Sequence, residues 1–298
     1  MDHPHSTLRP RPTRRLARPG GLRRARREPA ALSRLQPPGG LLVWRDQSAP
    51  GPDNMAADEI LAGAARQRGD ALVRLYGWEP GTVSLGGFQA IADAERLPDL
   101  AGWPIVRRPS GGGAIVHGTD ITYCLALPGT HPWARRAEDL YAAVHSALVD
   151  ELRARGVAAS LVDAATAARV PAADFFCFNR RAFGDVVIAA PDPGLPAGGW
   201  KVLGSAQRRL AGVIMQHGSL LVRRHPLMRG SGSHPGLADL VGVVGDDSAG
   251  VVEGWLERLA VRLDGPLGEM SGPSWASFEA DYQRRAAKYA GDAWRRRR

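Results

Sequence analysis

Short stretches with a strand-like alternation of apolar residues follow one another along this chain, often with no helix between them. In the segment 71–78, Val73 and Leu75 alternate with Arg74 and Tyr76, and 82–89 is the expected hairpin partner. Further strands are expected at 105–108, 114–118, 120–127, 157–162, 184–190, 201–204 and 213–222. Strands that follow one another directly are typical of the α+β class, in which helices and strands do not alternate strictly.

Amphipathic helices are predicted between and after these strands. The first follows Asp53-Asn54, which are expected to cap it, and it ends at Gly69. The other helices are predicted at 136–156, 250–263 and 275–290. Loops rich in Ala, Pro and Gly are predicted at 163–174 and 191–199.

The basic charge of this chain is confined to its two ends. The 298 residues carry a formal net charge of +9, but residues 1–40 hold ten Arg against two acidic residues, and the chain closes with four Arg. Positions 41–294 hold 25 basic and 28 acidic residues, so nucleic acid is not an expected partner. We predict a disordered Arg/Pro-rich tail over 1–40, a single domain over 41–290 and a solvated basic tail over 291–298.

The sequence contains no obvious membrane or metal signal. No apolar run approaches the ~18 to 20 residues that cross a bilayer, and the N-terminus lacks the apolar stretch of a secretory signal. The predicted location is therefore the cytoplasm, without a membrane partner. Two cysteines are too few for a disulfide framework, and neither they nor the eight His have metal-site spacing, so free thiols and no bound metal are predicted.

Lysine is nearly absent from this chain, which uses 37 Arg but has Lys only at positions 201 and 288. The guanidinium of Arg is a bulky, permanently charged fork, whereas the compact ammonium of Lys fits beside a carbonyl or a thiolate. Lys201 is accordingly a candidate for an amine with a functional role. A Lys that extends along the protein surface is an equally good interpretation.

Cys177 lies between aromatic residues in ADFFCFNRR, just before a predicted strand. A free Cys is most often a small buried hydrophobe, and Cys124, which alternates with Tyr123 and Leu125 in a strand, is assigned to the core. A nucleophilic Cys177 would need a nearby cation to stabilise its thiolate. Lys201 lies one strand and one loop further along the chain, so a hairpin would bring the two together.

A glycine cluster joins two predicted strands in RRPSGGGAIVHG, residues 107–118. Three adjacent Gly expose backbone N–H groups and allow a ligand to approach closely, although an ordinary turn would use the same residues. The spacing matches neither a dinucleotide-binding fingerprint nor a phosphate-binding P-loop. His117 closes the loop, and His217 is expected to point from its strand into a pocket or the core.

Four stretches of the chain together resemble the biotin/lipoate A/B protein ligase family, in the order that the family shows. They are NMAADEIL at 54–61, RLYGWEPGTVSLGGFQ at 74–89, RRPSGGGAIVHGTDITY at 107–123 and KVLGSAQRRLAGVIMQHGSLLV at 201–222. The resemblance implies a catalytic core like that of class II synthetases and biotin-protein ligases, with a mixed, largely antiparallel sheet and flanking helices. It is closest to the cysteine-dependent octanoyltransferases, because CFNRRAFGDVVI places a Cys before the Lys motif.

This resemblance implies an octanoyltransferase of lipoate metabolism. Octanoyl would pass from acyl carrier protein to Cys177 as a thioester, and then to a lysine of a lipoyl domain or of the glycine cleavage H protein, with no cofactor. Lys201 would help to ionise the thiol and hold the acyl carbonyl, and Leu85, Ile115 and Val213 would line an apolar slot. The resemblance, together with the reading of His117 at the end of the glycine loop, implies a set of substrate-binding residues. They are Arg107, Ser110, Gly111, Gly112, Gly113, His117, Gly204, Ser205, Ala206 and His217.

Other functions are compatible with the same residues. An ATP-dependent lipoate-protein ligase would hold an acyl-adenylate with the glycine loop and Lys201, would use ATP and Mg²⁺, and would leave Cys177 incidental. An octanoyl amidotransferase between lipoyl domains would use the same Cys and Lys. A non-catalytic module would bind a lipoyl domain or an acyl chain without turnover.

Three pairs of arginines are a candidate docking patch for an acidic carrier protein, at 180–181, 208–209 and 223–224. Each pair is also explained as a solvated face.

Overall fold

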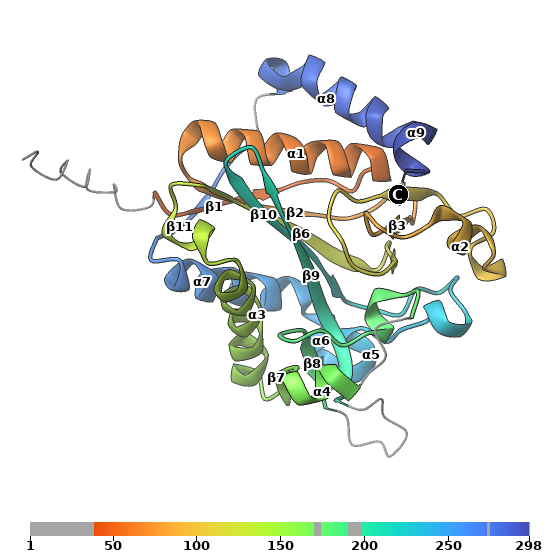
Figure 1. Ribbon diagram of the computed structural model, residues 1–298. Helices are drawn as coiled ribbons and strands as arrows, with labels where there is room; N and C mark the ends of the chain where they lie inside the picture. The colour runs from red at the N-terminus through yellow and green to blue at the C-terminus, as the bar shows by residue number, and fades with distance from the viewer. Residues whose placement is uncertain (1–38, 170–173, 190–197, 273–274, 298) are drawn as a thin grey trace, which may run out of the picture. The chain divides into compact units, whose positions relative to one another are not determined.

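An eight-stranded mixed sheet forms the centre of the structure, a computed structural model that describes residues 39–169, 174–189, 198–272 and 275–297 (Figure 1). Three strands at one edge run parallel, and the other neighbours pair antiparallel. In spatial order the strands are β11 (Leu267–Glu269), β1 (Leu41–Arg45), β2 (Ala71–Tyr76), β6 (Asp120–Pro128), β10 (Val213–Leu221), β9 (Trp200–Leu210), β8 (Val186–Ile188) and β7 (Ala159–Leu161). The predicted α+β class with a mixed, largely antiparallel sheet is confirmed.

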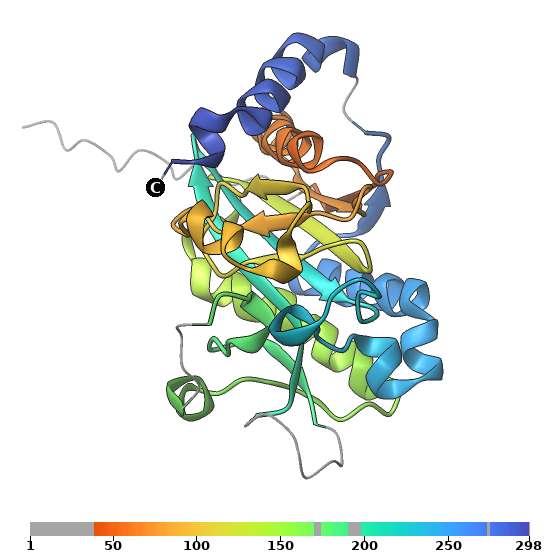
Figure 2. The same ribbon diagram turned by 90° about the vertical axis from the view of Figure 1, so that its right-hand side faces the viewer.

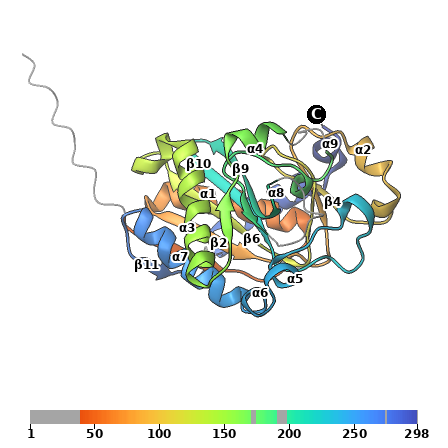
Figure 3. The same ribbon diagram turned by 90° about the horizontal axis from the view of Figure 1, so that it is seen from below.

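Helices cover both faces of this sheet, because alternate strand residues point to opposite sides and both sides are apolar. On one face lies α1 (Gly51–Arg68), and α8 (Trp275–Ala290) packs outside it (Figures 1 and 2). On the other face α3 (Ala137–Ala154) and α7 (Ser248–Arg262) lie together, in front of the strands in the view from below (Figure 3). All six residues of β2 are consequently buried.

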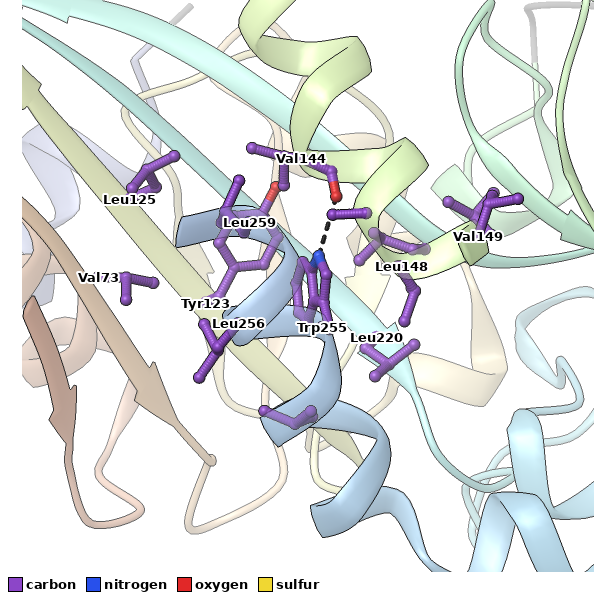
Figure 4. Packing of buried hydrophobic residues seen from close by; sticks show 14 of the residues in the cluster. Val73, Tyr123, Leu125, Val144, Leu148, Val149, Leu220, Trp255, Leu256 and Leu259 are labelled. Atoms are coloured by element: carbon purple, nitrogen blue, oxygen red, sulfur yellow. Dashed lines mark hydrogen bonds between the residues drawn. The ribbon is translucent and has the colours of Figure 1, made fainter. Parts of the chain in front are cut away.

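Trp255 of α7 is the largest fully buried side chain in the described part of the chain. Its indole N–H donates to the carbonyl of Val144 at 2.9 Å, and its ring meets that of Tyr123 edge-on at 5.1 Å (Figure 4). A buried indole N–H needs such a partner, because burial has removed its hydrogen bond with water. One side chain therefore ties α7 to both α3 and the sheet.

The start of α1 differs from the prediction. The expected cap at Asp53-Asn54 is wrong, because the helix already begins at Gly51, with Pro50 as its N-cap residue. Asn54 is fully buried within the helix, and its amide donates to two backbone carbonyls at 3.0 Å each, which fixes the helix against the neighbouring loops. The end at Gly69 is confirmed, since this residue has the left-handed φ of 79° that favours glycine.

A second sheet has three strands, β4 (Ile105–Arg107), β3 (Val83–Leu85) and β5 (Ile115–Val116), in the order β4-β3-β5. The hairpin predicted between 71–78 and 82–89 is wrong, because β2 pairs with β1 and β6 while β3 pairs with β4 and β5. Both edges of β2 are thus occupied. The chain turns away after it, and Trp78 Nε1 donates to Thr122 Oγ1 of β6 at 2.8 Å.

Short helices occupy the connections. They are α2 (Ile91–Glu95), α4 (Ala164–Arg169), α5 (Leu237–Val241), α6 (Val243–Asp246), α9 (Asp292–Arg295) and the 3₁₀ helices η1 (Pro98–Leu100), η2 (Pro132–Arg135), η3 (Cys177–Asn179) and η4 (Gly230–Gly232). The loop predicted over 163–174 is wrong where α4 forms, because Ala favours helix and Asp163 Oδ1 accepts a hydrogen bond from the Thr166 backbone N–H at 2.6 Å. Most of the loop predicted at 191–199 lies outside the described residues.

The two predicted tails have different outcomes. Of the tail expected over 1–40, residues 1–38 lie outside the described residues. The solvated tail expected over 291–298 is wrong, because α9 forms there and Trp294 Nε1 donates to the carbonyl of Arg107 at 3.0 Å. Arg296 also pairs with Glu95 at 2.9 Å. Within the described ranges, no helix combines the length and apolar character that a membrane crossing requires.

We predict that Trp255→Ala lowers the free energy of unfolding by about 3 to 5 kcal/mol, because it removes a fully buried ring and its hydrogen bond to α3. The matched control is Val261→Ala on the same helix, whose side chain is 76% exposed; it should change this free energy by less than about 0.5 kcal/mol. Urea unfolding followed by circular dichroism measures both. Equal effects of the two substitutions would contradict the central position of Trp255.

Candidate active site

Cys177 opens the short helix η3, directly beside the glycine loop. Its backbone N–H donates to the carbonyl of Ala114 at 2.8 Å, and the Ala114 N–H donates to the carbonyl of Phe175 at 2.9 Å. At Gly113 a Cβ would lie 2.8 Å from the Cys177 nitrogen, so a larger residue would push the two segments apart. The glycine cluster therefore allows the loop at 110–113 to meet the Cys177 turn.

Lys201 of β9 lies beside this turn with its side chain buried. Its Nζ is 3.5 Å from Cys177 Sγ, 3.3 Å from the Cys177 carbonyl oxygen and 2.9 Å from Asp185 Oδ2. Since Lys201 is 2% exposed, its interpretation as a surface lysine is wrong. Burial acts to lower the pKa of this amine, but the neighbouring Cys177 and Asp185 outweigh burial and raise the pKa above its ordinary value. Lys201 is therefore an ammonium at neutral pH.

Asp185 is a residue of this site that sequence reasoning missed. It lies just before β8 and is 1% exposed. Besides the ion pair with Lys201, its carboxylate accepts hydrogen bonds from Tyr141 Oη at 2.9 Å and from the Ala182 backbone N–H at 2.6 Å. The available signal was an acidic residue at the start of the strand after Cys177, because a buried Lys requires a nearby anion.

Gly204 provides the space that the Lys201 side chain fills. A Cβ at this position would lie 2.4 Å from Lys201 Cε and 2.6 Å from its Nζ. Since distances under 3.0 Å force one of the two atoms to move, a side chain at position 204 would displace the end of Lys201, so the glycine in KVLGSAQ has a packing role. It lets the amine fold back along β9 towards Cys177.

A cavity with about 400 Å³ of space opens beside Cys177, between the glycine loop and strands β9 and β10. The predicted site residues that line it are Gly111, Gly112, His117, Cys177, Gly204, Ser205, Ala206 and His217. Its other lining residues are Met55, Tyr76, Trp78, Arg108, Ile115, Thr122, Gly218 and Ser219. Three further predicted site residues, Lys201, Ser110 and Gly113, do not line the cavity. The fold thus brings three motifs, far apart in sequence, around one space.

Arg108 occupies the place at the cavity that was predicted for Arg107. Arg107, a predicted substrate-binding residue, does not line the cavity, and its guanidinium donates to three backbone carbonyls elsewhere. Arg108 lines the cavity and donates to the carbonyls of Gly111 and Gly113 at 3.1 and 2.8 Å. Successive side chains alternate along an extended chain, which explains this difference. Burial lowers the pKa of Arg108 to about 10, so this brace of the glycine loop is still charged at neutral pH.

The two predicted histidines each lie between a hydroxyl and a carboxylate. His217 Nε2 is hydrogen-bonded to Ser110 Oγ, and its Nδ1 lies 3.4 Å from Asp58 Oδ2. His117 Nδ1 lies 2.7 Å from Asp120 Oδ2, and its Nε2 lies 2.7 Å from a serine hydroxyl. Burial lowers the pKa of His117, so its ring is neutral at pH 7. In the described ranges, no three His, Cys, Asp or Glu residues gather as a possible metal site.

The apolar wall of the cavity differs from the predicted slot. Ile115 lines the cavity as expected, but Leu85 packs in the core of the small sheet and Val213 packs in the core on the α1 side. Met55 of α1 and Trp78, in the turn after β2, supply apolar wall instead. Neither belongs to a strand, which is why the strand pattern did not indicate them.

The candidate docking patch is also changed by the structure. Arg181 is 6% exposed and donates to backbone carbonyls, so it cannot belong to a surface patch. Arg223 pairs with Asp246, and Arg208 donates to the carbonyl of Pro109. These arginines therefore have partners within the chain, and the patch as predicted is wrong at Arg181.

Known proteins resemble this chain in sequence and in fold. The family model of the lipoyl protein ligase A/B catalytic domain matches residues 50–226. Octanoyltransferase LipM of Kyrpidia tusciae is 32% identical over 275 residues, which cover 82% of this chain and 94% of that protein. Octanoyltransferase LipM of Symbiobacterium thermophilum is 36% identical over 185 residues, which cover 58% of this chain and 62% of that protein.

Solved structures extend the likeness to the fold. The structure of a putative lipoate protein ligase from T. acidophilum with bound lipoic acid superposes with a TM-score of 0.60. The alignment covers 87% of this chain and 100% of that one at 17% identity, a level that establishes the fold alone. The predicted ligase-like catalytic core is therefore confirmed.

We predict that Gly204→Ala displaces the Lys201 ammonium from Cys177 and slows alkylation of Cys177 by iodoacetamide at pH 7 about tenfold. Tenfold corresponds to a rise of roughly 1.4 kcal/mol in the activation free energy of the alkylation. Gly63→Ala is the matched control, because a Cβ there meets nothing within 4 Å. Peptide mass spectrometry separates Cys177 from the buried Cys124. Alkylation of Gly204→Ala at the control's rate would rule out this packing role.

Proposed function

We propose that Cys177 carries octanoyl as a thioester in this chain, which belongs to the lipoyl protein ligase A/B catalytic domain family and is an octanoyltransferase of lipoate metabolism. The donor would be octanoyl on acyl carrier protein, and the acceptor a lysine of a lipoyl domain or of the glycine cleavage H protein. The observation that carries the proposal is the 3.5 Å contact between Cys177 Sγ and Lys201 Nζ. It lies at the cavity lined by the glycine loop and by strands β9 and β10.

In the first step, the thiolate of Cys177 attacks the carbonyl carbon of the donor thioester. The bond between Sγ and this carbon forms, and the carbon–sulfur bond of the donor breaks. The released donor sulfur takes up the proton that Cys177 gave up. Because one thioester replaces another, the step is close to isoenergetic and requires no ATP.

In the second step, the amine of the acceptor lysine attacks the same carbon. The carbon–nitrogen bond forms, the bond to Sγ breaks, and a proton of the amine passes to the released sulfur. An amide is more stable than a thioester, so the second step drives the sequence forward. The enzyme ends with its thiol regenerated.

Lys201 supports both steps through its charge. Its ammonium lies 3.5 Å from the sulfur of Cys177 and can donate a hydrogen bond to the attacking sulfur. Its N–H groups also stabilise negative charge that develops on the carbonyl oxygen in each tetrahedral intermediate. Asp185, at 2.9 Å, holds the amine in place and is a positioning residue, since it acts on Lys201 and not on the substrate.

An ATP-dependent ligase is the second candidate function, and the fold shared with a putative lipoate protein ligase favours it. A ligase would activate the acid as an acyl-adenylate, so a lysine beside the cavity would serve it and a thiol would not. The contact between Lys201 and Cys177 therefore supports the transferase. The amidotransferase would share the Cys177 thioester and differ in its donor.

We predict that the wild-type protein gains one octanoyl group on Cys177 when it is incubated with octanoyl acyl carrier protein, as measured by intact mass spectrometry. Cys177→Ser should slow transfer to a lipoyl domain at least about a thousandfold, because a serine hydroxyl is a far weaker nucleophile. Cys124→Ala is the matched control, since Cys124 is fully buried and does not line the cavity. Transfer that needs lipoate and ATP and survives Cys177→Ser would favour the ligase.

We predict that Lys201→Arg slows formation of the octanoyl adduct about a hundredfold although it keeps the charge. The forked guanidinium is too large for the space beside Gly204, and misplacing a catalytic group by about 1 Å has an effect of this size. Lys288→Arg is the matched control, because Lys288 pairs with Glu59 outside the cavity at 2.9 Å. Stopped time points analysed by mass spectrometry give both rates. A wild-type rate in Lys201→Arg would show that the size and shape of the side chain at position 201 do not matter for formation of the adduct.

A further inference from the structure

The short helix α9 lies against β4, the strand that leads into the glycine loop (Figure 3). Two hydrogen bonds run in opposite directions between the two elements. Trp294 Nε1 donates to the backbone carbonyl of Arg107 at 3.0 Å, and Arg107 Nε donates to the carbonyl of Arg295 at 2.8 Å. Arg107, just before the loop at 110–113, is therefore bound to α9 through both its backbone and its side chain.

The same guanidinium binds a turn on its other side. Arg107 Nη1 donates to the carbonyl of Gly86 at 2.9 Å and to that of Gln89 at 2.6 Å. It thus closes the turn at 86–89, here called the bridging turn, across its two ends. The planar guanidinium fork presents several N–H donors in a fixed geometry, whereas the compact ammonium of a Lys cannot span three separate carbonyls. Arg107 therefore connects α9 to the bridging turn.

The buried charge of Arg107 makes this connection sensitive to α9. The residue is 0% exposed, and its hydrogen-bond partners among the residues that the structure describes are the three backbone carbonyls. A buried charge that is stabilised by carbonyl dipoles loses a large share of its stabilisation when one carbonyl is removed. Displacement of α9 would therefore let the Arg107 side chain shift, and the bridging turn would shift with it.

The bridging turn contacts both segments that meet at the nucleophile. The Gly87 N–H donates to the carbonyl of Ser110, at the start of the glycine loop, at 2.7 Å. Gln89 Nε2 donates to the carbonyl of Phe175 at 3.0 Å, close before Cys177 in the chain. Hydrogen bonds from one turn thus reach the glycine loop and the segment that carries the thiol.

Backbone packing makes the contact with the glycine loop rigid. A Cβ at Gly86 would lie 2.0 Å from the carbonyl oxygen of Gly112, so no side chain separates the bridging turn from the loop. Closely packed groups transmit a shift, because no flexible side chain lies between them to absorb it. Gly111 and Gly112 line the cavity beside Cys177. A displacement of the bridging turn therefore changes the wall of this cavity.

We propose that Trp294 and Arg107 are positioning residues of the acyl-transfer site, which act through the bridging turn on the glycine loop and on the Cys177 turn. The proposal rests on the proposed function, because it assigns these residues to the same site. No described residue of α9 lines the cavity, so α9 acts on the geometry with which the loop faces Cys177. Such geometry matters, since misplacing a catalytic group by about 1 Å lowers a rate about a hundredfold.

Trp294→Phe tests the proposal, because it keeps an aromatic ring and removes the N–H that the Arg107 carbonyl accepts. Octanoyl addition to Cys177 from octanoyl acyl carrier protein is followed by intact mass spectrometry. Its kcat should fall about 5- to 20-fold, a part of the loss expected for a displacement of about 1 Å. KM should stay within about twofold, because Met55 and Trp78, which supply apolar wall, belong to other elements.

Arg296→Ala is the matched control in the same segment, because Arg296 is exposed and pairs with Glu95 at the surface. It should leave kcat and KM unchanged. A wild-type kcat in Trp294→Phe, or an equal loss in Arg296→Ala, would overturn the positioning role. A wild-type protein that octanoyl acyl carrier protein does not acylate would instead overturn the proposed function.

A double variant tests the route through the bridging turn. Gln89→Leu removes the bond to the Phe175 carbonyl and should by itself lower kcat. If Trp294 acts through this turn, the loss of kcat in Trp294→Phe/Gln89→Leu should be well below the product of the two single losses, because the two substitutions interrupt one series of contacts. Single losses that multiply in the double variant would overturn the route.

Hydrogen exchange measured by mass spectrometry tests the same contacts without any acyl transfer. In Trp294→Phe, peptides that contain the bridging turn and the glycine loop should exchange about 3- to 10-fold faster, the effect of one lost hydrogen bond. A peptide from β6, at the centre of the large sheet, should exchange at the wild-type rate and so show that the fold is intact. Unchanged exchange in the bridging turn and the loop, or an equal increase in β6, would overturn the proposal.

Discussion

The buried ammonium of Lys201 governs the arrangement around Cys177. Lys201 is 2% exposed. A buried ammonium is tolerated in a protein interior when an opposite charge and hydrogen-bond acceptors surround it. Asp185 supplies the charge, and the pairing of β8 with β9, in which Lys201 lies opposite Val187, places the two side by side. The Cys177 turn supplies the other acceptors, its carbonyl oxygen and its sulfur. Strand pairing in the large sheet thus determines which atoms the thiol meets.

Two glycines make this contact sterically possible. Gly113 admits the backbone of Cys177 to the glycine loop, and Gly204 admits the side chain of Lys201 to the same place. A Cβ at Gly113 would lie 2.8 Å from the backbone nitrogen of Cys177, and a Cβ at Gly204 would lie 2.4 Å from the end of the Lys201 side chain and would push it away. The glycines of both motifs therefore act first through close packing. Arg108 then braces the loop by donating to the carbonyls of Gly111 and Gly113.

The sequence predicted the site residues that lie within recognisable motifs. It did not predict the residues that reach the site through contacts between distant parts of the chain. The glycine loop, Cys177 and the strand with Lys201 do lie together, and the family and the fold are confirmed. Asp185 was missed because no motif contains it, and Arg108 was passed over for Arg107 because alternation on a strand depends on a register that the sequence does not state. The β2–β3 hairpin failed for a related reason: β1 and β6, distant in sequence, occupy both edges of β2.

The positive charge near the sulfur would have a consequence for the second half of the proposed reaction. Lys201 and Arg108 are both buried cations close to the Cys177 thiol, and both are charged at neutral pH. In the proposed route, a field of this sign would lower the pKa of any amine that enters the cavity, because positive charge disfavours the ammonium form. The acceptor lysine would therefore lose its proton more readily at the thioester than in water, and a neutral amine is the form that attacks. One electrostatic feature would then serve both proposed steps, because cations that attract a sulfur anion also favour the neutral form of the amine that later displaces it.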